Sequence, residues 1–154
     1  MSLIIDEAII ATKLNVVDSA SVITKMGEKL LNAGLVNDDF IEAVIRREEK
    51  YPTGLPTSIP VALCHTDPEY VKNSFLTVAT LENPVPFHEM GSPDHIQQVR
   101  IVFFLGILEK DKHIDILRNI MKFIQSNPLL QSIDTTDSKS EIKKILLENL
   151  KPNE

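Results

Sequence analysis

Apolar residues recur at spacings of three and four in two segments of the first third of the chain, which is the period of a helix with one buried face. In the first segment, Asp18 is a suitable N-cap and Gly34 a suitable C-terminal stop. In the second, Asn37 is the expected N-cap, two aspartates occupy the first turn, and the helix ends in the charged run 46–50. The sequence therefore predicts two amphipathic helices, with apolar faces formed by Val22, Ile23, Met26, Leu30 and Ala33 and by Phe40, Ile41, Val44 and Ile45.

Short apolar runs without helical spacing predict the strands of a sheet. The runs cover residues 7–12, 59–63, 75–81 and 99–108. A turn at 83–87 leads into more extended chain, and a loop is expected at Gly91. The run 99–108 is almost wholly apolar, as is typical of a central strand buried on both faces. With the extended chain counted, we expect about five strands.

Helical spacing returns in the last third of the chain. Asp111 precedes an amphipathic segment that we expect to stop at Pro128, because proline has no backbone N–H for the helix. Ser138 and Glu141 then form a capping box for a final helix. We expect the apolar faces of these helices to flank the sheet.

Helices that alternate with strands indicate an α/β layer structure. Two connections between the middle strands are too short for helical crossovers, so antiparallel as well as parallel pairs are expected. A chain of 154 residues has the length of one domain. We therefore expect residues 1–154 to form a single α/β domain, with a mixed sheet of about five strands flanked by helices.

Composition and charge narrow the classes of function. Hydrophobic residues make up 43% of the chain and charged residues 25%, as in ordinary globular proteins, and the net charge is -6. An acidic chain is repelled by nucleic-acid phosphates and by anionic membranes. No apolar run reaches the roughly 18–20 residues needed to cross a bilayer, and residues 1–10 lack the features of an export signal. We expect a cytoplasmic protein that neither binds nucleic acid nor inserts into a membrane.

His65 is the residue with the strongest case for chemistry. It follows the predicted strand 59–63, and Thr66 or Asp67 can cap a helix with Pro68 in its first position. Strand ends carry functional residues in many α/β folds, and a helix N-terminus offers free amides to a phosphate or another oxyanion. A histidine that merely packs at the end of a strand is the alternative interpretation.

Two arginines and a second histidine are further candidates. The paired guanidinium groups of Arg46 and Arg47, just before the proline-rich loop that leads to His65, suit a phosphoryl group. A solvated charge run, with ion pairs four residues apart, is the alternative. His113 lies in the first turn of the helix after the buried strand, either near the same sheet edge as His65 or simply exposed at the helix start.

The remaining histidines and the cysteine support weaker hypotheses. His88 and His95 lie in polar loop sequence, without the spacing or partner cysteines of a metal site. Cys64 precedes His65 on a strand, where neighbouring side chains point to opposite faces, so a buried structural thiol is expected rather than a Cys–His dyad. A single cysteine also excludes an internal disulfide. The chain has no P-loop, GxGxxG, GxSxG or HExxH motif.

Two stretches around these candidates resemble a known family. The sequences REEKYPTGL at 47–55 and IPVALCHT at 59–66 resemble the enzyme IIA domain of the bacterial sugar phosphotransferase system, in its mannitol/fructose superfamily. The tract YPTG at 51–54 is most similar to the galactitol type. The resemblance extends over nearly the whole chain, with strands and helices in matching order, and it implies the enzyme IIA fold.

The resemblance implies a phosphotransferase component that works through a phosphohistidine. The histidine at the position of His65 accepts a phosphoryl group from phospho-HPr and passes it to a cysteine of a sugar-specific enzyme IIB, which serves the membrane enzyme IIC. The arginine at the position of Arg47 lies near the phosphohistidine, and the second histidine of mannitol- and fructose-type members matches His113. Neither a cofactor nor a metal is implied. Cys64 takes the place of the proline that members usually carry before the active histidine.

The resemblance also bears on partners and regulation. An apolar rim around His65, formed by Leu55, Ile59 and Leu63, is expected to serve docking of the partner proteins. Nitrogen-type IIA proteins and IIA-like regulatory domains share the fold and the histidine. A regulatory phosphoprotein is therefore the alternative to a component of sugar uptake.

Overall fold

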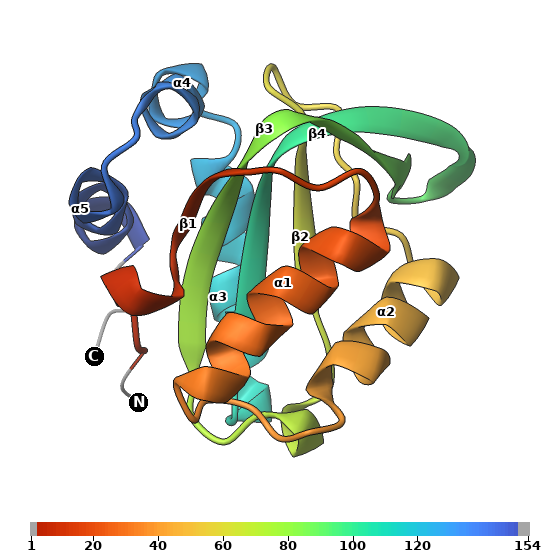
Figure 1. Cartoon of the computed structure of the whole chain (residues 1–154), viewed down its shortest axis with the longest axis vertical. Coiled ribbons are helices and arrows are strands. Elements are labelled where there is room, and N and C mark those ends of the chain that lie inside the picture. Colours follow the sequence, from red (N-terminus) through yellow and green to blue (C-terminus); the bar gives the residue numbers. More distant parts are fainter. Residues whose placement is uncertain (1–2, 151–154) are drawn as a thin grey trace.

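The computed structural model describes residues 3–150, which form a sheet with helices on both faces (Figure 1). The strands are β1 (Ala11–Leu14), β2 (Val61–His65), β3 (Phe75–Glu89) and β4 (Ser92–Gly106). Two short 3₁₀ turns are η1 (Glu7–Ile9) and η2 (Pro68–Tyr70). The helices are α1 (Ser19–Asn32), α2 (Phe40–Lys50), α3 (Lys110–Phe123), α4 (Asn127–Thr135) and α5 (Lys139–Leu150).

Within residues 3–150 the sheet has four strands in the order β1-β3-β4-β2 and is mixed, as predicted. β3 and β4 form a long antiparallel hairpin, while β1 pairs parallel with β3 and β2 pairs parallel with β4. β1 and β2 are therefore the two edges of the sheet. The expected count of about five strands is too high by one.

The count differs because the chain around 83–87 continues β3 instead of turning into a new strand. β3 runs through Pro84 and Pro86. β1 pairs with β3 only as far as Leu81. In the described part of the chain, the stretch of β3 that contains the prolines therefore pairs on one side only, with β4. Proline is tolerated at such an edge because its missing N–H is not needed for pairing on the open side. The expected loop nearby shrinks to a tight turn at Gly91, whose φ of 78° suits glycine.

The predicted ends of α1 and the predicted start of α5 are confirmed. The side chain of Asp18 caps α1 by accepting a hydrogen bond from the Ser21 N–H at 2.7 Å. Gly34, just after α1, has a φ of 75°, as expected of a residue that stops a helix. The Ser138 hydroxyl accepts a hydrogen bond from the Glu141 N–H at 3.2 Å and so caps α5. The Ser138 N–H donates to the Thr136 hydroxyl at 3.1 Å instead of to the Glu141 side chain, so half of the expected capping box forms.

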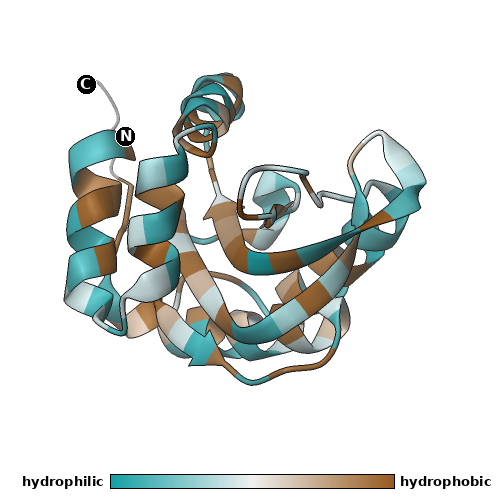
Figure 2. Cartoon of the chain, turned by 90° about the horizontal axis from the view of Figure 1, so that it is seen from above, coloured by the Kyte–Doolittle hydropathy of each residue, from teal (hydrophilic) through white to brown (hydrophobic). Residues whose placement is uncertain are grey.

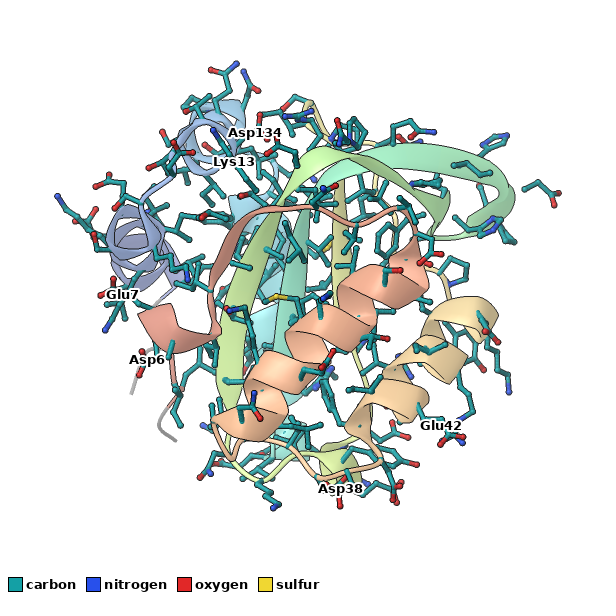
Figure 3. All side chains as sticks on the ribbon, viewed as in Figure 1. Asp6, Glu7, Lys13, Asp38, Glu42 and Asp134 are labelled. Atoms are coloured by element: carbon teal, nitrogen blue, oxygen red, sulfur yellow. The ribbon has the colours of Figure 1, made fainter. Side chains whose placement is uncertain are left out.

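Two local expectations near the N-terminus are wrong. The strand expected from residue 7 begins with η1, because the Asp6 side chain accepts a hydrogen bond from the Ala8 N–H and turns the chain at this point (Figure 3). The N-cap position of α2 is Asp39, whose side chain makes no capping hydrogen bond, rather than Asn37. The Asn37 side chain instead accepts a hydrogen bond from the Asp39 N–H, one turn before the helix proper.

The boundaries around two prolines also differ from expectation. α3 ends at Phe123, before the stop expected at Pro128. Pro128 lies in the first turn of α4, where backbone N–H groups have no partner within the helix, so proline is well tolerated there. The strand expected at 59–63 begins only after Pro60, because proline cannot donate to the sheet. β2 therefore includes His65 as its last residue, whereas the sequence placed this histidine just after the strand.

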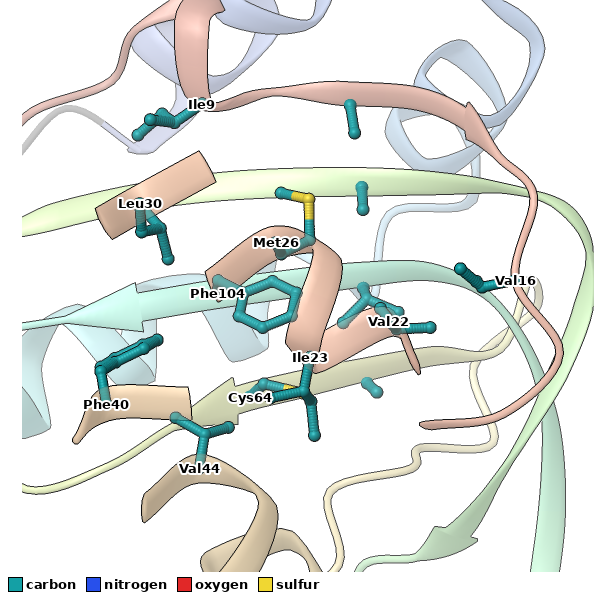
Figure 4. Packing of buried hydrophobic residues seen from close by; sticks show 14 of the residues in the cluster. Ile9, Val16, Val22, Ile23, Met26, Leu30, Phe40, Val44, Cys64 and Phe104 are labelled. Atoms are coloured by element: carbon teal, nitrogen blue, oxygen red, sulfur yellow. The ribbon is translucent and has the colours of Figure 1, made fainter. Parts of the chain in front are cut away.

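Two hydrophobic clusters fill the spaces on either side of the sheet. One lies between the sheet and the helices α1 and α2 and contains Ala62 and Cys64 of β2 (Figure 4). The other lies on the side of α3, α4 and α5 and contains Val61 and Leu63. Successive residues of β2 thus alternate between the two clusters, as in any strand. This alternation puts His65, two residues after Leu63, on the α3 side.

The helices are amphipathic rather than uniformly apolar (Figure 2). In α1, for example, Val22, Met26 and Leu30 are buried, whereas Lys25 and Glu28 are exposed. Within residues 3–150, none of the helices is long and apolar enough to cross a membrane.

We predict that Gly106→Ala lowers the free energy of unfolding by about 1–3 kcal/mol, the usual cost of forcing extra atoms into a packed core. Gly106 ends β4 opposite Phe75, and a Cβ atom at this position would overlap the Phe75 ring. Urea denaturation of the purified proteins measures the change.

The control combines Gly106→Ala with Phe75→Leu, which removes the ring from the space that the new methyl group needs. The two changes should cost less together than the sum of their separate costs. Strictly additive costs would show that the ring does not limit residue size at position 106.

Candidate active site

β2 is an edge strand, and the loop that precedes it completes its outer edge. The main-chain groups on that edge belong to alternate residues, because a strand presents its amides to either side in turn. Val61 exchanges hydrogen bonds of 2.8 and 3.4 Å with Leu55, and the Leu63 N–H donates to the Thr53 hydroxyl at 3.1 Å. The carbonyl of Leu63 projects from the same edge and is available to a side chain.

His65 uses this carbonyl. Its Nδ1 atom lies 2.9 Å from the Leu63 carbonyl oxygen. Because a carbonyl only accepts hydrogen bonds, Nδ1 must carry the proton and Nε2 must hold the lone pair. The acceptor that fixes the tautomer is therefore the main chain two residues earlier, and Nε2 is the nucleophilic atom.

Burial keeps the His65 ring neutral. The residue is 9% exposed, and this burial is the largest cause that lowers its pKa from 6.5 to about 4. The hydrogen bond to Leu63 and the charge of Asp67 oppose the change in pKa, whereas the charges of Arg47 and His113 add to it. The His65 ring is thus neutral at neutral pH, with a proton on Nδ1 and none on Nε2, which is the form that can act as a nucleophile.

A pocket of about 220 Å³ opens beside His65 and brings the three predicted site residues together. Arg47 reaches it from α2, and Lys110 and His113 reach it from the first turn of α3. The ring centroids of His65 and His113 lie 5.7 Å apart, and burial, with the nearby charge of Arg47, lowers the pKa of His113. A neutral nucleophile beside basic side chains from two helices is an arrangement that suits a phosphoryl group.

The two adjacent arginines have different surroundings. Arg46 is exposed and pairs with Glu42, one turn earlier on the outer face of α2, at 3.4 Å (Figure 3). This is the solvated pair of the alternative interpretation. Arg47 instead lines the pocket, with its guanidinium 5.5 Å from the centroid of the Tyr51 ring. Among the described residues, the Nε atom of Arg47 is buried and has no hydrogen-bond partner, so the guanidinium keeps unused hydrogen-bonding capacity.

Two expectations about the surroundings of the site are wrong. The helix expected after Asp67 is only the single turn η2, which is too short to present a helix dipole, and Asp67 itself adds a negative charge to the pocket. In the expected apolar rim, Leu63 is only 2% exposed and cannot meet a partner, while Leu55 and Ile59 are half-buried. The more exposed apolar side chains that line this pocket or the neighbouring one are Tyr51, Met90 and Ile114.

The sequence prediction did not include Lys110, which lines the pocket, or the hydrogen-bonded pair of Glu48 and Thr53 beside Arg47 and Leu63. Lys110 stands three positions before His113, a spacing that places both on one face of α3. Glu48 stands four positions after the buried Val44, which marks it as the inward-facing member of the charged run. Its partner Thr53 has no comparable signal, because their contact joins a helix to a loop.

Cys64 and the remaining histidines lie away from the pocket. Cys64 is buried in the cluster beneath α1 and α2, and burial raises its pKa well above the ordinary value, so the predicted structural thiol is confirmed (Figure 4). In the hairpin of β3 and β4, His88 Nδ1 lies 2.8 Å from the Pro93 carbonyl and His95 Nδ1 lies 3.9 Å from a Glu89 oxygen. Residues 3–150 contain no group of three or more His, Cys, Asp or Glu side chains that could hold a metal ion.

Several known proteins are similar to this chain. The protein-family model for the phosphoenolpyruvate-dependent sugar phosphotransferase system, EIIA 2, matches residues 3–149. The galactitol-specific EIIA component of the phosphotransferase system from Escherichia coli K12 is 25% identical over 123 residues, which are 79% of this chain and 81% of that protein.

Two solved structures have the same fold as this chain. One is the complex of enzyme IIAMtl with phosphorylated enzyme IIBMtl from Escherichia coli, with a TM-score of 0.75 and 20% identity over 92% of this chain and 95% of that chain. The other is the nitrogen regulatory protein IIA-Ntr from Neisseria meningitidis, with a TM-score of 0.75 and 23% identity over 92% of this chain and 94% of that chain. At these identities the likeness extends to the fold alone.

We predict that acidification destabilises the protein through His65 between about pH 6.5 and about pH 4. The folded-state pKa lies below the unfolded value, so the unfolded chain binds more protons in this window and stability rises with pH across it. The change in pKa from 6.5 to about 4 corresponds to about 3 kcal/mol. Urea denaturation across this pH range measures the loss.

His65→Gln is the matched variant, because glutamine can still donate to the Leu63 carbonyl but does not titrate. Burial raises the pKa of Glu48, so this residue makes stability fall as the pH rises, which is opposite to the effect of His65. The effect of Glu48 is present in both proteins and does not alter their difference. The variant should lose about 3 kcal/mol less than the wild type on acidification. Parallel stability profiles would contradict a lowered pKa for His65.

Proposed function

Since the chain belongs to the EIIA 2 family of the phosphoenolpyruvate-dependent sugar phosphotransferase system, we propose that it is a phosphocarrier that holds its phosphoryl group on His65. Members of this family are phosphotransferase components with a phosphohistidine intermediate. One observation carries the assignment to His65. The hydrogen bond from Nδ1 to the Leu63 carbonyl leaves Nε2 unprotonated, in a residue that shares a pocket with Arg47, Lys110 and His113.

The proposed reaction is a displacement at phosphorus. Nε2 of His65 attacks the phosphorus atom of phospho-HPr, and the new N–P bond forms as the bond to HPr breaks and HPr leaves with the electron pair. Arg47 and Lys110 balance the charge of the phosphoryl oxygens, and His113 can donate a hydrogen bond to one of them. In the second step, a cysteine thiolate of enzyme IIB attacks the same phosphorus, and the electron pair of the N–P bond returns to Nε2.

We assign the chain to carbohydrate uptake of the galactitol type, with HPr as the phosphoryl donor and enzyme IIB as the acceptor, which in turn serves the membrane enzyme IIC. The similarity to the galactitol-specific EIIA component of Escherichia coli supports the sugar type. The solved complex of an enzyme IIA with a phosphorylated enzyme IIB supports the class of acceptor. Such a carrier works in the cytoplasm, and we propose that residues 1–154 form its single domain.

A regulatory phosphoprotein is the competing function. The likeness to the nitrogen regulatory protein IIA-Ntr is one of fold alone and favours neither function. A regulator would keep the phosphoryl group or lose it to water, whereas a carrier passes it to an enzyme IIB. Transfer to an enzyme IIB of the galactitol type therefore separates the two.

We predict that His65→Gln abolishes phosphorylation. The purified wild type, incubated with phosphoenolpyruvate, enzyme I and HPr, should acquire an acid-labile phosphoryl group and pass it to a galactitol-type enzyme IIB. Transfer of labelled phosphate measures both steps. His113→Gln is the control histidine and should still be labelled, while label that persists in His65→Gln would contradict the assignment.

Arg47→Ala should slow phosphorylation about 100-fold while the fold is kept, because one donor to the developing oxyanion is lost. Arg46→Ala is the matched control, since it removes only the exposed pair with Glu42. Rapid-quench measurement of labelled phosphate gives both rates. Equal rates for the two variants would assign Arg47 to the solvated charge run.

A further inference from the structure

Glu48 is a buried carboxylate on α2, immediately after Arg47. It is 9% exposed, and burial raises its pKa, an effect that hydrogen bonds from Thr53 partly offset. Removing a carboxylate from water is unfavourable unless its oxygens find donors. The donors that Glu48 finds, and the groups to which they lead, therefore indicate what it does.

Both carboxylate oxygens of Glu48 accept hydrogen bonds from Thr53. Oε2 accepts from the Thr53 N–H at 2.8 Å, and Oε1 accepts from the Thr53 hydroxyl at 2.7 Å. A hydroxyl has one proton, so the Thr53 oxygen is then free only to accept. It accepts from the Leu63 N–H at 3.1 Å. Glu48 therefore sets the direction of this chain of hydrogen bonds.

The same backbone segment leads to His65. Leu63 gives its N–H to Thr53, and its carbonyl accepts from His65 Nδ1 at 2.9 Å. Both main-chain groups project from the outer edge of β2, where a neighbouring strand would otherwise hold them. The Thr53 hydroxyl takes the place of that strand and holds the residue whose carbonyl orients the His65 ring.

We propose that Glu48 and Thr53 are positioning residues for phosphoryl transfer, which fix the Leu63 backbone and thereby the orientation and tautomer of His65. The pair also ties α2, which carries Arg47, to β2, which carries the nucleophile. Neither residue needs to touch the phosphoryl group for this role. The proposal rests on the function proposed for His65, but the tautomer of the unphosphorylated ring tests it independently of transfer.

Three threonine variants test the proposal. Thr53→Val keeps the shape of the side chain and removes the hydroxyl, whereas Thr53→Ser keeps the hydroxyl. Thr57→Val is the matched control, because the Thr57 hydroxyl donates locally to the Ile59 carbonyl at 2.7 Å. Nitrogen-15 NMR of the unphosphorylated proteins at neutral pH reports which ring nitrogen of His65 carries the proton, and rapid quench reports the rate of phosphorylation by phospho-HPr.

We expect Thr53→Val to show a measurable population of the Nε2–H tautomer and to be phosphorylated about 10- to 100-fold more slowly, as when a reacting group is slightly misplaced. Thr53→Ser should restore most of the rate and the wild-type tautomer, and Thr57→Val should match the wild type. A folded Thr53→Val protein with the wild-type tautomer and rate would overturn the proposal.

Glu48→Gln decides the question if Thr53→Val does not fold. Glutamine offers one carbonyl oxygen in place of two carboxylate oxygens, so the tautomer and the rate should change in the same direction as expected for Thr53→Val. An unchanged tautomer and rate would again overturn the positioning role. If the wild type accepts no phosphoryl group from phospho-HPr, the proposed function fails, while the tautomers of the variants still test the role of Glu48 and Thr53.

Discussion

The hydrogen bond between the His65 ring and the Leu63 carbonyl is the interaction on which the rest of the site depends. It forms because β2 lies at the edge of the sheet, where one row of main-chain groups is not used by β4. An open edge invites pairing with other chains. Here Leu55 and Thr53 take up part of that edge, and the carbonyl that remains holds the histidine. The site is thus built from the unpaired edge of the sheet.

Burial and positive charge act on His65 in the same direction. Both lower its pKa, so the ring is kept neutral before any phosphoryl group arrives. In the proposed reaction, the charge of Arg47 that disfavours an imidazolium then stabilises the phosphoryl oxygens. The negative charge of Asp67 raises the pKa of His65 and so opposes the lowering, but Asp67 is exposed, and solvent screens its charge. The same positive charge therefore favours a neutral His65 ring before the reaction and an anionic phosphoryl group on the ring after it.

The features that the sequence predicted are those that depend on local pattern. The Asp18 cap follows from residue type and position, and the burial of Cys64 away from His65 follows from the alternation of a strand. The candidate site residues His65, Arg47 and His113 were found from their places at the ends of predicted elements and from the family resemblance, and the structure places them around one pocket.

The features that were missed depend on contacts between elements distant in space. A turn was expected at 83–87, where β3 instead continues through two prolines. They are tolerated because the pairing of β1 with β3 ends at Leu81, before the prolines begin. In the sequence, Glu48 is one of several charged residues at the end of a helix, and its role becomes visible only through its contacts with Thr53 and, through Thr53, with Leu63.

The most direct test of the account is the identity of the phosphorylated nitrogen of His65, which nitrogen-15 and phosphorus-31 NMR of the phosphorylated protein distinguish through the N–P coupling. The hydrogen bond to Leu63 predicts phosphorylation at Nε2 with Nδ1 still protonated, and phosphorylation at Nδ1 would contradict it.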